Sequence, residues 1–310
     1  MRNDECGIPK SAFRNPHWID LRSGLAILTF IMKQHARTAR AAAGSLPPEM
    51  QGMKVVILCG GRGTRLGRET ETKPKPMAEI GDKPILWHIM KHYAHYGFKD
   101  FVLCLGYRGE VIRRYFLDYL TANSDFTIGL ADERLEFHNR DRNLDWNVTL
   151  VDTGLDAMTG ARVKRIERYI DSERFMLTYG DGVSDLNVHD LLRFHELHGA
   201  TGTLTGVQPV SRFGELKVRG NRIAEFHEKV HFRTNYVNGG FFVFSRKFFD
   251  YLENDDSCVL EKKPLERLAR DGQMMVYKHC GFWQCVDTIR DLELLNDLWT
   301  RNAAPWKVWK

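Results

Sequence analysis

A glycine-rich stretch with two arginines is the first group of residues able to do chemistry. It runs from Leu58 to Arg65 as Leu-Cys-Gly-Gly-Arg-Gly-Thr-Arg, directly after an apolar run. Glycines let a backbone turn sharply and bring several N–H groups toward one point, which makes a pocket for phosphate oxygens. Arg65 adds a planar, permanently charged group suited to phosphate. The stretch therefore indicates either a phosphate-binding loop or a glycine-rich turn with a solvated arginine.

The glycine spacing argues against a dinucleotide-binding Rossmann turn. Leu66 stands at the third glycine position of G-x-G-x-x-G, although the looser Gly61-x-Gly63-x-x-x-Gly67 is present. A Rossmann turn opens directly into a long helix, whereas the prolines of Lys73-Pro-Lys-Pro76 interrupt any helix soon after the loop. The sequence thus disfavours an NAD(P)-dependent oxidoreductase, which titration with NAD(P)H would test.

The Lys73-Pro-Lys-Pro76 stretch is itself a candidate anion-binding element. Two prolines stiffen the backbone from which two lysines project, so less conformational entropy is lost when an ammonium group binds. Lys75 follows Arg65 closely enough to return to the same anion. The alternative is a solvated basic turn.

Two aspartates are candidates for binding a cation. Asp181 lies between two glycines after the apolar run Phe175–Tyr179, and ligands of open α/β sheets collect beyond the carboxyl ends of the strands. Carboxylates there suit Mg²⁺ bound jointly with substrate phosphates. Because one carboxylate is a poor site, Asp287 is the expected second ligand. The alternative for Asp287 is a helix N-cap.

Other catalytic patterns are absent or weak. His88, His92 and His95 have zinc-like helical spacing, but no H-E-x-x-H motif accompanies them, so we interpret them as partly buried or interfacial. We find no G-x-S-x-G and no cysteine beside a histidine motif. A phosphate monoester substrate needs neither, because its oxygen is already an anionic nucleophile. Transfer at phosphorus then depends on positioning and electrostatics.

The elements expected to position these residues alternate between strands and helices. Apolar runs at 54–59, 101–105 and 175–179 predict buried strands, and 84–96 and 110–120 predict helices. Runs at 201–207, 216–218, 223–226 and 241–244 add strands, and 289–299 predicts the last helix. The fold class is α/β: a single Rossmann-like three-layer domain with a mainly parallel sheet and mixed strands in its second half.

The composition of the chain bears on its partners and its location. The 310 residues are 43% apolar and 27% charged, with a net charge of +5, which does not indicate a nucleic-acid partner. No charge-free apolar run approaches the ~20 residues that cross a membrane. The six cysteines form no C-x-x-C pair, so we expect a reducing, cytoplasmic location. Residues 1–52 hold seven basic and four acidic residues. We expect an N-terminal extension there, poorly ordered or not part of the native chain, before a catalytic domain at 53–310.

Together these residues resemble the sugar-phosphate nucleotidylyltransferases, whose signature is a first strand ending in G-G-x-G-T-R and then a K-P-K stretch. The similarity runs from Met53 to the end of the chain, and residues 1–52 have no counterpart. It is greatest to members that use CTP and glucose 1-phosphate. The further matching stretches are Lys73-Pro-Lys-Pro-Met77, Ile85-Leu-Trp-His-Ile-Met90, Trp146-Asn-Val-Thr-Leu-Val-Asp-Thr-Gly154, Met158-Thr-Gly160, Tyr179-Gly-Asp-Gly-Val183, Asn238-Gly-Gly-Phe-Phe-Val243, Gly281-Phe-Trp-Gln284 and Ala304-Pro-Trp-Lys307.

The resemblance implies a role for each matching site residue. Arg65 would contact the departing β- and γ-phosphates, and Lys75 the phosphates near the reacting α-phosphorus. Asp181 and Asp287 would hold Mg²⁺. The Lys of an E-K-P motif, here Glu228-Lys229, would meet the sugar phosphate. The remaining nucleotide-binding positions would be Leu58, Cys59, Gly60, Gly61, Arg62, Gly63, Thr64, Arg162 and Gly180.

The resemblance further implies a homo-oligomer that makes CDP-glucose and pyrophosphate, feeding deoxysugar and cell-surface polysaccharide synthesis. Two alternatives stay open at this point. One is the same chemistry with UTP or dTTP, or with another sugar phosphate. The other is a non-catalytic sugar-nucleotide sensor on the same fold, against which the presence of both Lys75 and Asp181 argues.

Overall fold

The computed structural model describes residues 52–67, 69–140, 144–209, 215–219, 221–227 and 236–309. Its strands are β1 Lys54–Leu58, β2 Glu79–Ile80, β3 Lys83–Pro84, β4 Asp100–Leu105, β5 Ser124–Gly129, β6 Arg134–Arg140, β7 Asn147–Asp152, β8 Arg174–Tyr179, β9 Gly182–Ser184, β10 Gly202–Val207, β11 Glu215–Arg219, β12 Arg222–His227, β13 Val237–Ser245, β14 Met274–His279 and β15 Trp283–Cys285. The α-helices are α2 Glu69–Thr72, α3 Ile85–His95, α4 Gly109–Ala122, α5 Thr159–Arg165, α6 Val188–His198, α7 Lys263–Arg270 and α8 Ile289–Thr300. The 3₁₀ helices are η3 Thr64–Leu66, η4 Lys75–Met77, η5 Glu167–Tyr169 and η6 Arg246–Tyr251.

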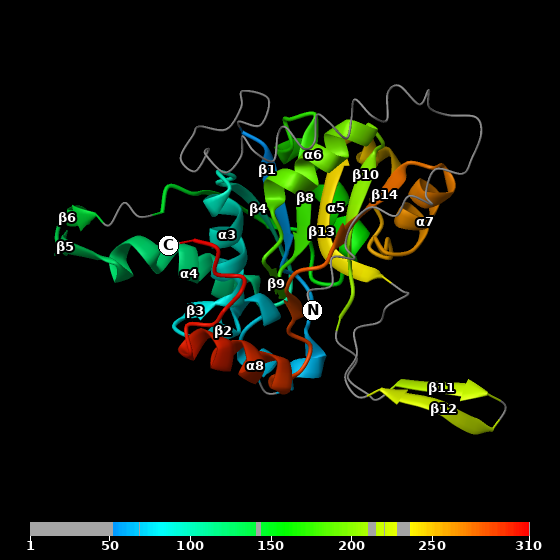
Figure 1. Ribbon diagram of the computed structural model, residues 1–310. Helices are drawn as coiled ribbons and strands as arrows, with labels where there is room; N and C mark the ends of the chain where they lie inside the picture. Colours follow the sequence, from blue (N-terminus) through cyan, green and yellow to red (C-terminus); the bar gives the residue numbers. More distant parts are fainter. Residues whose placement is uncertain are drawn as a thin grey trace, which may run out of the picture. The chain divides into compact units, whose positions relative to one another are not determined.

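Seven strands form the central sheet, in the order β14-β10-β13-β8-β1-β4-β7 (Figure 1). β1 is parallel to β4 and β8, β4 is parallel to β7, and β10 is parallel to β14, while β13 is antiparallel to both β8 and β10. The residues of β1 from Val55 onward are buried, as expected for a strand covered on both faces. The prediction of a mainly parallel sheet with mixed strands in the second half is confirmed.

Helices cover both faces of this sheet. On one face, Val56, Leu177 and Phe242 pack in a cluster with Ala161 and Val163 of α5, which also includes residues of η6 and α7. On the other face, the ring of Tyr93 in α3 lies 6.3 Å from that of Phe241, and His195 of α6 hydrogen-bonds Thr203 of β10. The domain is therefore the predicted three-layer arrangement.

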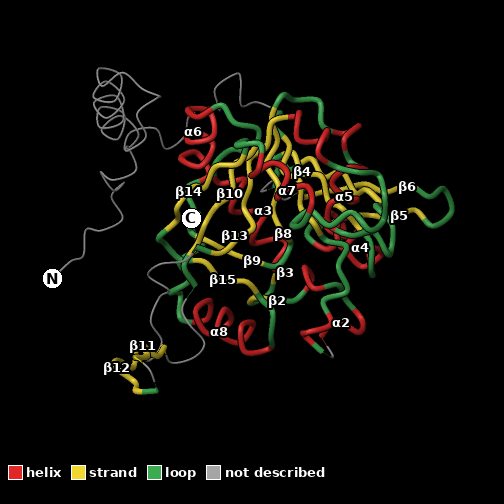
Figure 2. Tube along the Cα trace, turned by 90° about the vertical axis from the view of Figure 1, so that its right-hand side faces the viewer, coloured by secondary structure: helices red, strands yellow, loops and turns green. Residues whose placement is uncertain are grey.

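The remaining strands form separate two-stranded units. β11 and β12 were expected as strands and are paired with each other, but they do not join the central sheet (Figure 1). β5 and β6 form another hairpin outside it, which the sequence analysis did not identify. Short strands β9 and β15 pair antiparallel with each other, and this ribbon carries the site described below (Figure 2).

Several expectations fall outside what the structure describes. Residues 1–51 are among them, so the proposed N-terminal extension stays a prediction.

Among the described helices, none has the length and apolar content to cross a membrane. Cys59, Cys104 and Cys258 are buried free thiols, in keeping with their interpretation as small core residues.

Buried histidines make the stability of this domain sensitive to acid. Burial lowers the pKa of His88, His92 and His195 from 6.5 to about 4. Between pH 6.5 and 4 the unfolded chain therefore binds more protons than the folded one, so stability is lost as the pH falls through this window. Each histidine contributes up to about 3 kcal/mol to the loss.

We expect the thermal unfolding midpoint, measured at constant ionic strength, to fall steeply below pH 6.5. Replacing His92 with phenylalanine should flatten this dependence. The matched variant His138→Phe, at an exposed position of β6, should leave it unchanged. An unfolding midpoint that stays constant from pH 7 to 4.5 would contradict the assignment.

Candidate active site

Backbone hydrogen bonds with neighbouring segments hold the glycine-rich loop that follows β1. Cys59 N–H donates to Cys104 O at 3.0 Å, and Tyr107 N–H donates to Gly60 O at 3.1 Å. Gly63 has φ 62°, the left-handed conformation that favours glycine, and a Cβ atom there would lie 2.9 Å from Cβ of Lys75. The loop is followed by η3 and the four-residue α2 rather than by a long helix. This confirms that it is not a Rossmann turn.

Lys75 lies between the two candidate metal ligands. Its Nζ donates to Asp181 Oδ2 at 2.6 Å and to Asp287 Oδ1 at 2.8 Å. Pro74 is the N-cap of η4, and the side chain of Lys75 is only 12% exposed. Residues more than 200 positions apart in the sequence are thus brought to one point.

Gly180 brings the loop and this lysine together. Its N–H donates to Leu58 O at 3.1 Å. A Cβ atom at Gly180 would lie 2.8 Å from both Leu58 O and Pro76 Cγ, so no larger residue fits without displacing backbone. The end of β1, the Lys-Pro-Lys-Pro stretch and the end of β8 therefore meet at the carboxyl edge of the sheet.

The charges around Lys75 determine what the residue can do. Burial acts to lower the pKa of its ammonium group, but the charges and hydrogen bonds of Asp181 and Asp287 outweigh this and raise the pKa above its ordinary value. Lys75 is consequently a permanent cation at neutral pH and not a general base. It can stabilise phosphate oxygens but cannot accept a proton.

The thiols near this point are not nucleophiles. Burial, followed by the charges of neighbouring groups, raises the pKa of Cys59 well above its ordinary value. Burial and the carboxylates of Asp287 and Asp181 raise the pKa of Cys285 to about 12. Since the thiolate is the reactive form, both cysteines are inert at neutral pH. This agrees with the absence of a nucleophile motif in the sequence.

Asp287 does not cap α8, because other residues do so. Thr288 is the N-cap, and its side chain forms a capping box with Asp291. Asp291, which is 8% exposed, also accepts the N–H of Asp287 at 3.1 Å through Oδ2. Helix capping, the alternative role for Asp287, thus belongs to Thr288. Asp291 was not among the residues predicted from the sequence, although Thr288-x-x-Asp291 resembles a capping-box pattern.

Arg162 lies within the fold behind the loop. Its guanidinium group is buried and donates to Gly60 O at 3.0 Å, Leu105 O at 3.0 Å, Thr153 Oγ1 at 2.9 Å and Gly154 O at 2.7 Å. Its donors are thus used by the protein itself. The direct nucleotide contact implied by the resemblance is not what this geometry favours, and Arg162 instead braces the loop at Gly60.

The other candidate residues are less well placed. Arg62 is exposed and donates to Asp156 Oδ1 at 3.0 Å, on the outer side of the loop. A Cβ atom added at Gly61 would meet no other atom within 4 Å, so this part of the loop is open. The side chain of Arg65 and all of Glu228 and Lys229 lie outside the described residues, and their roles stay predictions.

The donor set suits Mg²⁺. No group of three or more His, Cys, Asp or Glu residues gathers as a metal cage among the described residues, including His88, His92 and His95. The two carboxylates nevertheless converge on a single cationic group, the Lys75 ammonium. Mg²⁺ is typically held by one or two carboxylates together with substrate phosphates. Asp181 and Asp287 fit that pattern.

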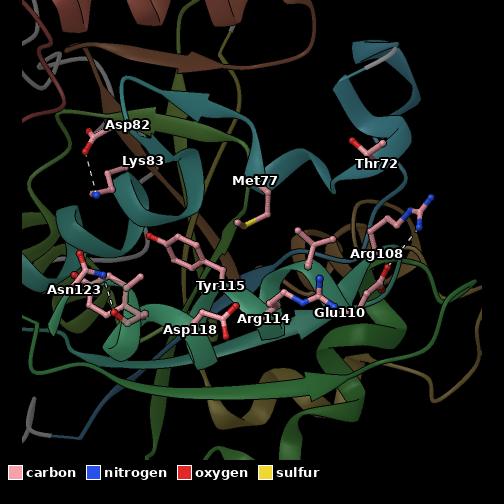
Figure 3. A pocket seen from close by; sticks show the side chains of 13 residues that line it. Thr72, Met77, Asp82, Lys83, Arg108, Glu110, Arg114, Tyr115, Asp118 and Asn123 are labelled. Carbon is pink, nitrogen blue, oxygen red and sulfur yellow. Dashed lines mark hydrogen bonds and ion pairs between the residues drawn. The ribbon is translucent and has the colours of Figure 1, made fainter. Parts of the chain in front are cut away.

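A cavity of about 700 Å³ lies elsewhere, between α4 and the β2–β3 hairpin (Figure 3). Met77 lines it, and on its rim Lys83 pairs with Asp82 at 3.1 Å and Arg108 with Glu110 at 3.7 Å. Neither the lysine nor the two carboxylates of the candidate site line this cavity. Arg114 and Asp118 also line it.

A polar network that sequence analysis did not identify borders the site on the β13 side. Tyr179 Oη donates to Glu261 Oε1 at 2.6 Å and accepts from Asn238 Nδ2 at 3.0 Å. Thr159 Oγ1 donates to Glu261 Oε2 at 2.7 Å. Glu261 lies in a loop remote in sequence from all the motifs, so only the fold could reveal its place here.

The fold and this site define a nucleotide-transfer protein, and the family comparison agrees. The model of the nucleotidyl transferase family matches residues 54–301, and the chain belongs to that family. It is 49% identical over 259 residues to glucose-1-phosphate cytidylyltransferase of Salmonella typhimurium, which covers 83% of this chain and 100% of the relative. It is 44% identical over 257 residues to a probable glucose-1-phosphate cytidylyltransferase of Bacillus subtilis, again covering 83% and 100%.

Solved structures agree on the fold. HddC from Yersinia pseudotuberculosis superimposes with a TM-score of 0.59 at 22% identity, over 80% of this chain and 99% of that one. A putative glucose-1-phosphate thymidylyltransferase from Bacillus anthracis gives a TM-score of 0.58 at 17% identity, over 83% and 98%. At these identities the likeness shows the architecture alone.

Proposed function

We propose that this chain transfers the cytidylyl group of CTP to α-D-glucose 1-phosphate, with CDP-glucose and pyrophosphate as products. A phosphate oxygen of the sugar phosphate forms a bond to the α-phosphorus of CTP. The bond from that phosphorus to the oxygen bridging to the β-phosphate breaks, and pyrophosphate leaves with the electron pair. No protein nucleophile is required, which accords with the protonated thiols of Cys59 and Cys285.

The residues of the site supply position and charge for this step. The N–H groups of the glycine-rich loop hold the nucleotide, and Arg162 keeps that loop in place through Gly60. Lys75 donates to phosphate oxygens near the α-phosphorus and stabilises their developing charge. Asp181 and Asp287 hold Mg²⁺, which when bound neutralises phosphate charge so that two polyanions can approach each other.

The observation that carries this proposal is the ammonium of Lys75 beside the glycine-rich loop and between two carboxylates. A sensor that only binds a sugar nucleotide has no need of a permanent cation and two acids at one point. The choice of cytidine over another base rests on the two cytidylyltransferase relatives, which match over their whole lengths.

Pyrophosphate release separates the candidate functions in one experiment. With glucose 1-phosphate and Mg²⁺, we expect turnover with CTP to exceed that with UTP, dTTP, ATP or GTP by at least 10-fold. Discrimination between nucleotides rests on base contacts, and a site built to hydrogen-bond one base leaves its polar groups unpaired with another.

Preference for UTP or dTTP would replace the cytidylyl assignment and keep the chemistry. Binding of CDP-glucose without turnover of any nucleotide would indicate the sensor. Replacing glucose 1-phosphate by mannose 1-phosphate in the same assay tests the sugar.

A further inference from the structure

The ribbon formed by β9 and β15 carries both candidate metal ligands at one end. Asp181 directly precedes β9 and Asp287 follows β15, and Val286 N–H donates to Asp181 O at 2.8 Å. In the two strands, Cys285 pairs with Gly182 and Trp283 with Ser184. The spacing of the two carboxylates therefore depends on how this ribbon is held.

At the other end of the ribbon, several polar groups surround the imidazole of His279. His279 Nε2 lies 3.1 Å from Ser184 Oγ and 3.2 Å from Phe282 O. Asp185 Oδ1 lies 2.9 Å from the same nitrogen, without hydrogen-bond geometry. His279 thus faces the residues that end β9 and the residue that precedes β15.

These contacts fix the proton on Nε2. Ser184 has one hydroxyl hydrogen, which it donates to Phe282 O at 2.8 Å, so Ser184 Oγ is an acceptor toward His279. Phe282 O and the carboxylate are acceptors as well. His279 Nε2 must consequently carry a hydrogen and donate it.

The group is not a nucleophilic triad. In a triad the serine and the aspartate contact different ring nitrogens, whereas here both contact Nε2. Ser184 is also only 2% exposed, so no substrate reaches its oxygen. The contacts are structural in kind and need a different explanation.

β15 gives that explanation, because it lies outside the central sheet. His279 is the last residue of β14, the strand at the edge of that sheet. Only three residues separate His279 from β15, and Gly281 among them has no room for a side chain, since a Cβ atom there would overlap Asp185 and crowd the His279 ring. The imidazole joins the rigid sheet to the ribbon.

We propose that His279 is a positioning residue for the metal site: its Nε2–H clasps β9 to the start of β15 and so sets the separation of Asp181 and Asp287. This inference rests on the proposed function, in which those two carboxylates hold a divalent cation. Residues that orient metal ligands typically change metal affinity 10- to 100-fold when replaced.

The test is a Mn²⁺ titration of the full chain followed by EPR, with thermal unfolding measured in parallel. His279→Phe keeps an aromatic ring but cannot donate, and we expect it to weaken Mn²⁺ binding at least 10-fold. His279→Gln places an amide N–H near the position of Nε2 and should stay within threefold of the parent protein. His138→Phe, on the exposed β5–β6 hairpin, is the matched control and should not change Mn²⁺ binding.

Gly281→Ala provides a second route if His279→Phe does not fold. It changes none of the residues that contact His279, but the added Cβ atom displaces the side chains of Asp185 and His279, so Mn²⁺ affinity should again fall at least 10-fold. Parent-like Mn²⁺ binding in the folded phenylalanine and alanine variants would overturn the proposal. So would a glutamine variant as weak as the phenylalanine variant. Mn²⁺ binding requires no turnover, so failure of the proposed reaction would be seen separately, in the pyrophosphate assay of the parent protein.

Discussion

Replacing Lys75 with alanine should lower kcat for CDP-glucose formation by at least 100-fold while the chain stays folded. The ammonium is a fixed cation held beside the glycine-rich loop that we propose to bind the nucleotide, and its removal takes away this positive charge. Loss of one such transition-state contact typically costs on the order of 10²–10³ in turnover. Steady-state pyrophosphate release at saturating CTP, glucose 1-phosphate and Mg²⁺ measures the effect.

Lys73 is the matched control for this variant. It belongs to the same Lys-Pro-Lys-Pro stretch, but its Nζ lies 3.7 Å from Glu79, an exposed partner. Lys73→Ala should keep turnover within threefold of the parent. Circular dichroism of both variants should match that of the parent protein, which checks that they fold. If Lys75→Ala retains near-parent kcat, the ammonium does not stabilise the transition state and the proposed mechanism fails.

The raised pKa of Lys75 adds a pH criterion. Because the two carboxylates keep the ammonium protonated, loss of a proton from Lys75 does not shape the rate between pH 6 and 9. The pH–rate profiles of the parent protein and of Lys75→Arg should therefore have the same shape on the alkaline side of this range.

How much of this site the sequence predicts depends on the kind of element that carries each residue. Lys75 and Asp181 could be predicted from local patterns. Prolines fix the backbone on both sides of Lys75, and the buried strand β8 ends just before Asp181. Asp287 was inferred because one carboxylate is insufficient and because the family resemblance implies a second metal ligand there. It lies after β15, a three-residue strand outside the central sheet, whose place no periodicity could predict.

The role of Arg162, in contrast, could not be predicted from a local pattern. The sequence resemblance places Arg162 among the nucleotide-binding positions, as expected for an arginine whose guanidinium group is available to a ligand. In the fold its guanidinium group donates to the carbonyl groups of three separate segments, at Gly60, Leu105 and Gly154. Which oxygens surround a side chain is a long-range property, and for that reason the bracing role of Arg162 and the clasp of His279 emerge only from the fold.

Replacing Asp181 with asparagine should lower kcat on the order of 100-fold. Asparagine has the same shape and removes one negative charge, so the ribbon of β9 and β15 is retained while the cation loses one of its two anionic ligands. The Mg²⁺ concentration that gives half-maximal turnover should rise in Asp181→Asn, and Mn²⁺ binding measured by EPR should weaken in parallel. Asp287→Asn should behave in the same way.

The double variant Asp181→Asn/Asp287→Asn separates a metal site from a purely structural ion pair. If the carboxylates hold the cation, the double variant loses Mn²⁺ binding at this site, because both of its anionic ligands are removed. If they serve only to orient Lys75, the double variant still binds Mn²⁺ and its turnover resembles that of Lys75→Ala at every Mg²⁺ concentration. Asp171→Asn, an exposed carboxylate 3.9 Å from Lys54, is the control for loss of charge alone and should leave both measurements unchanged.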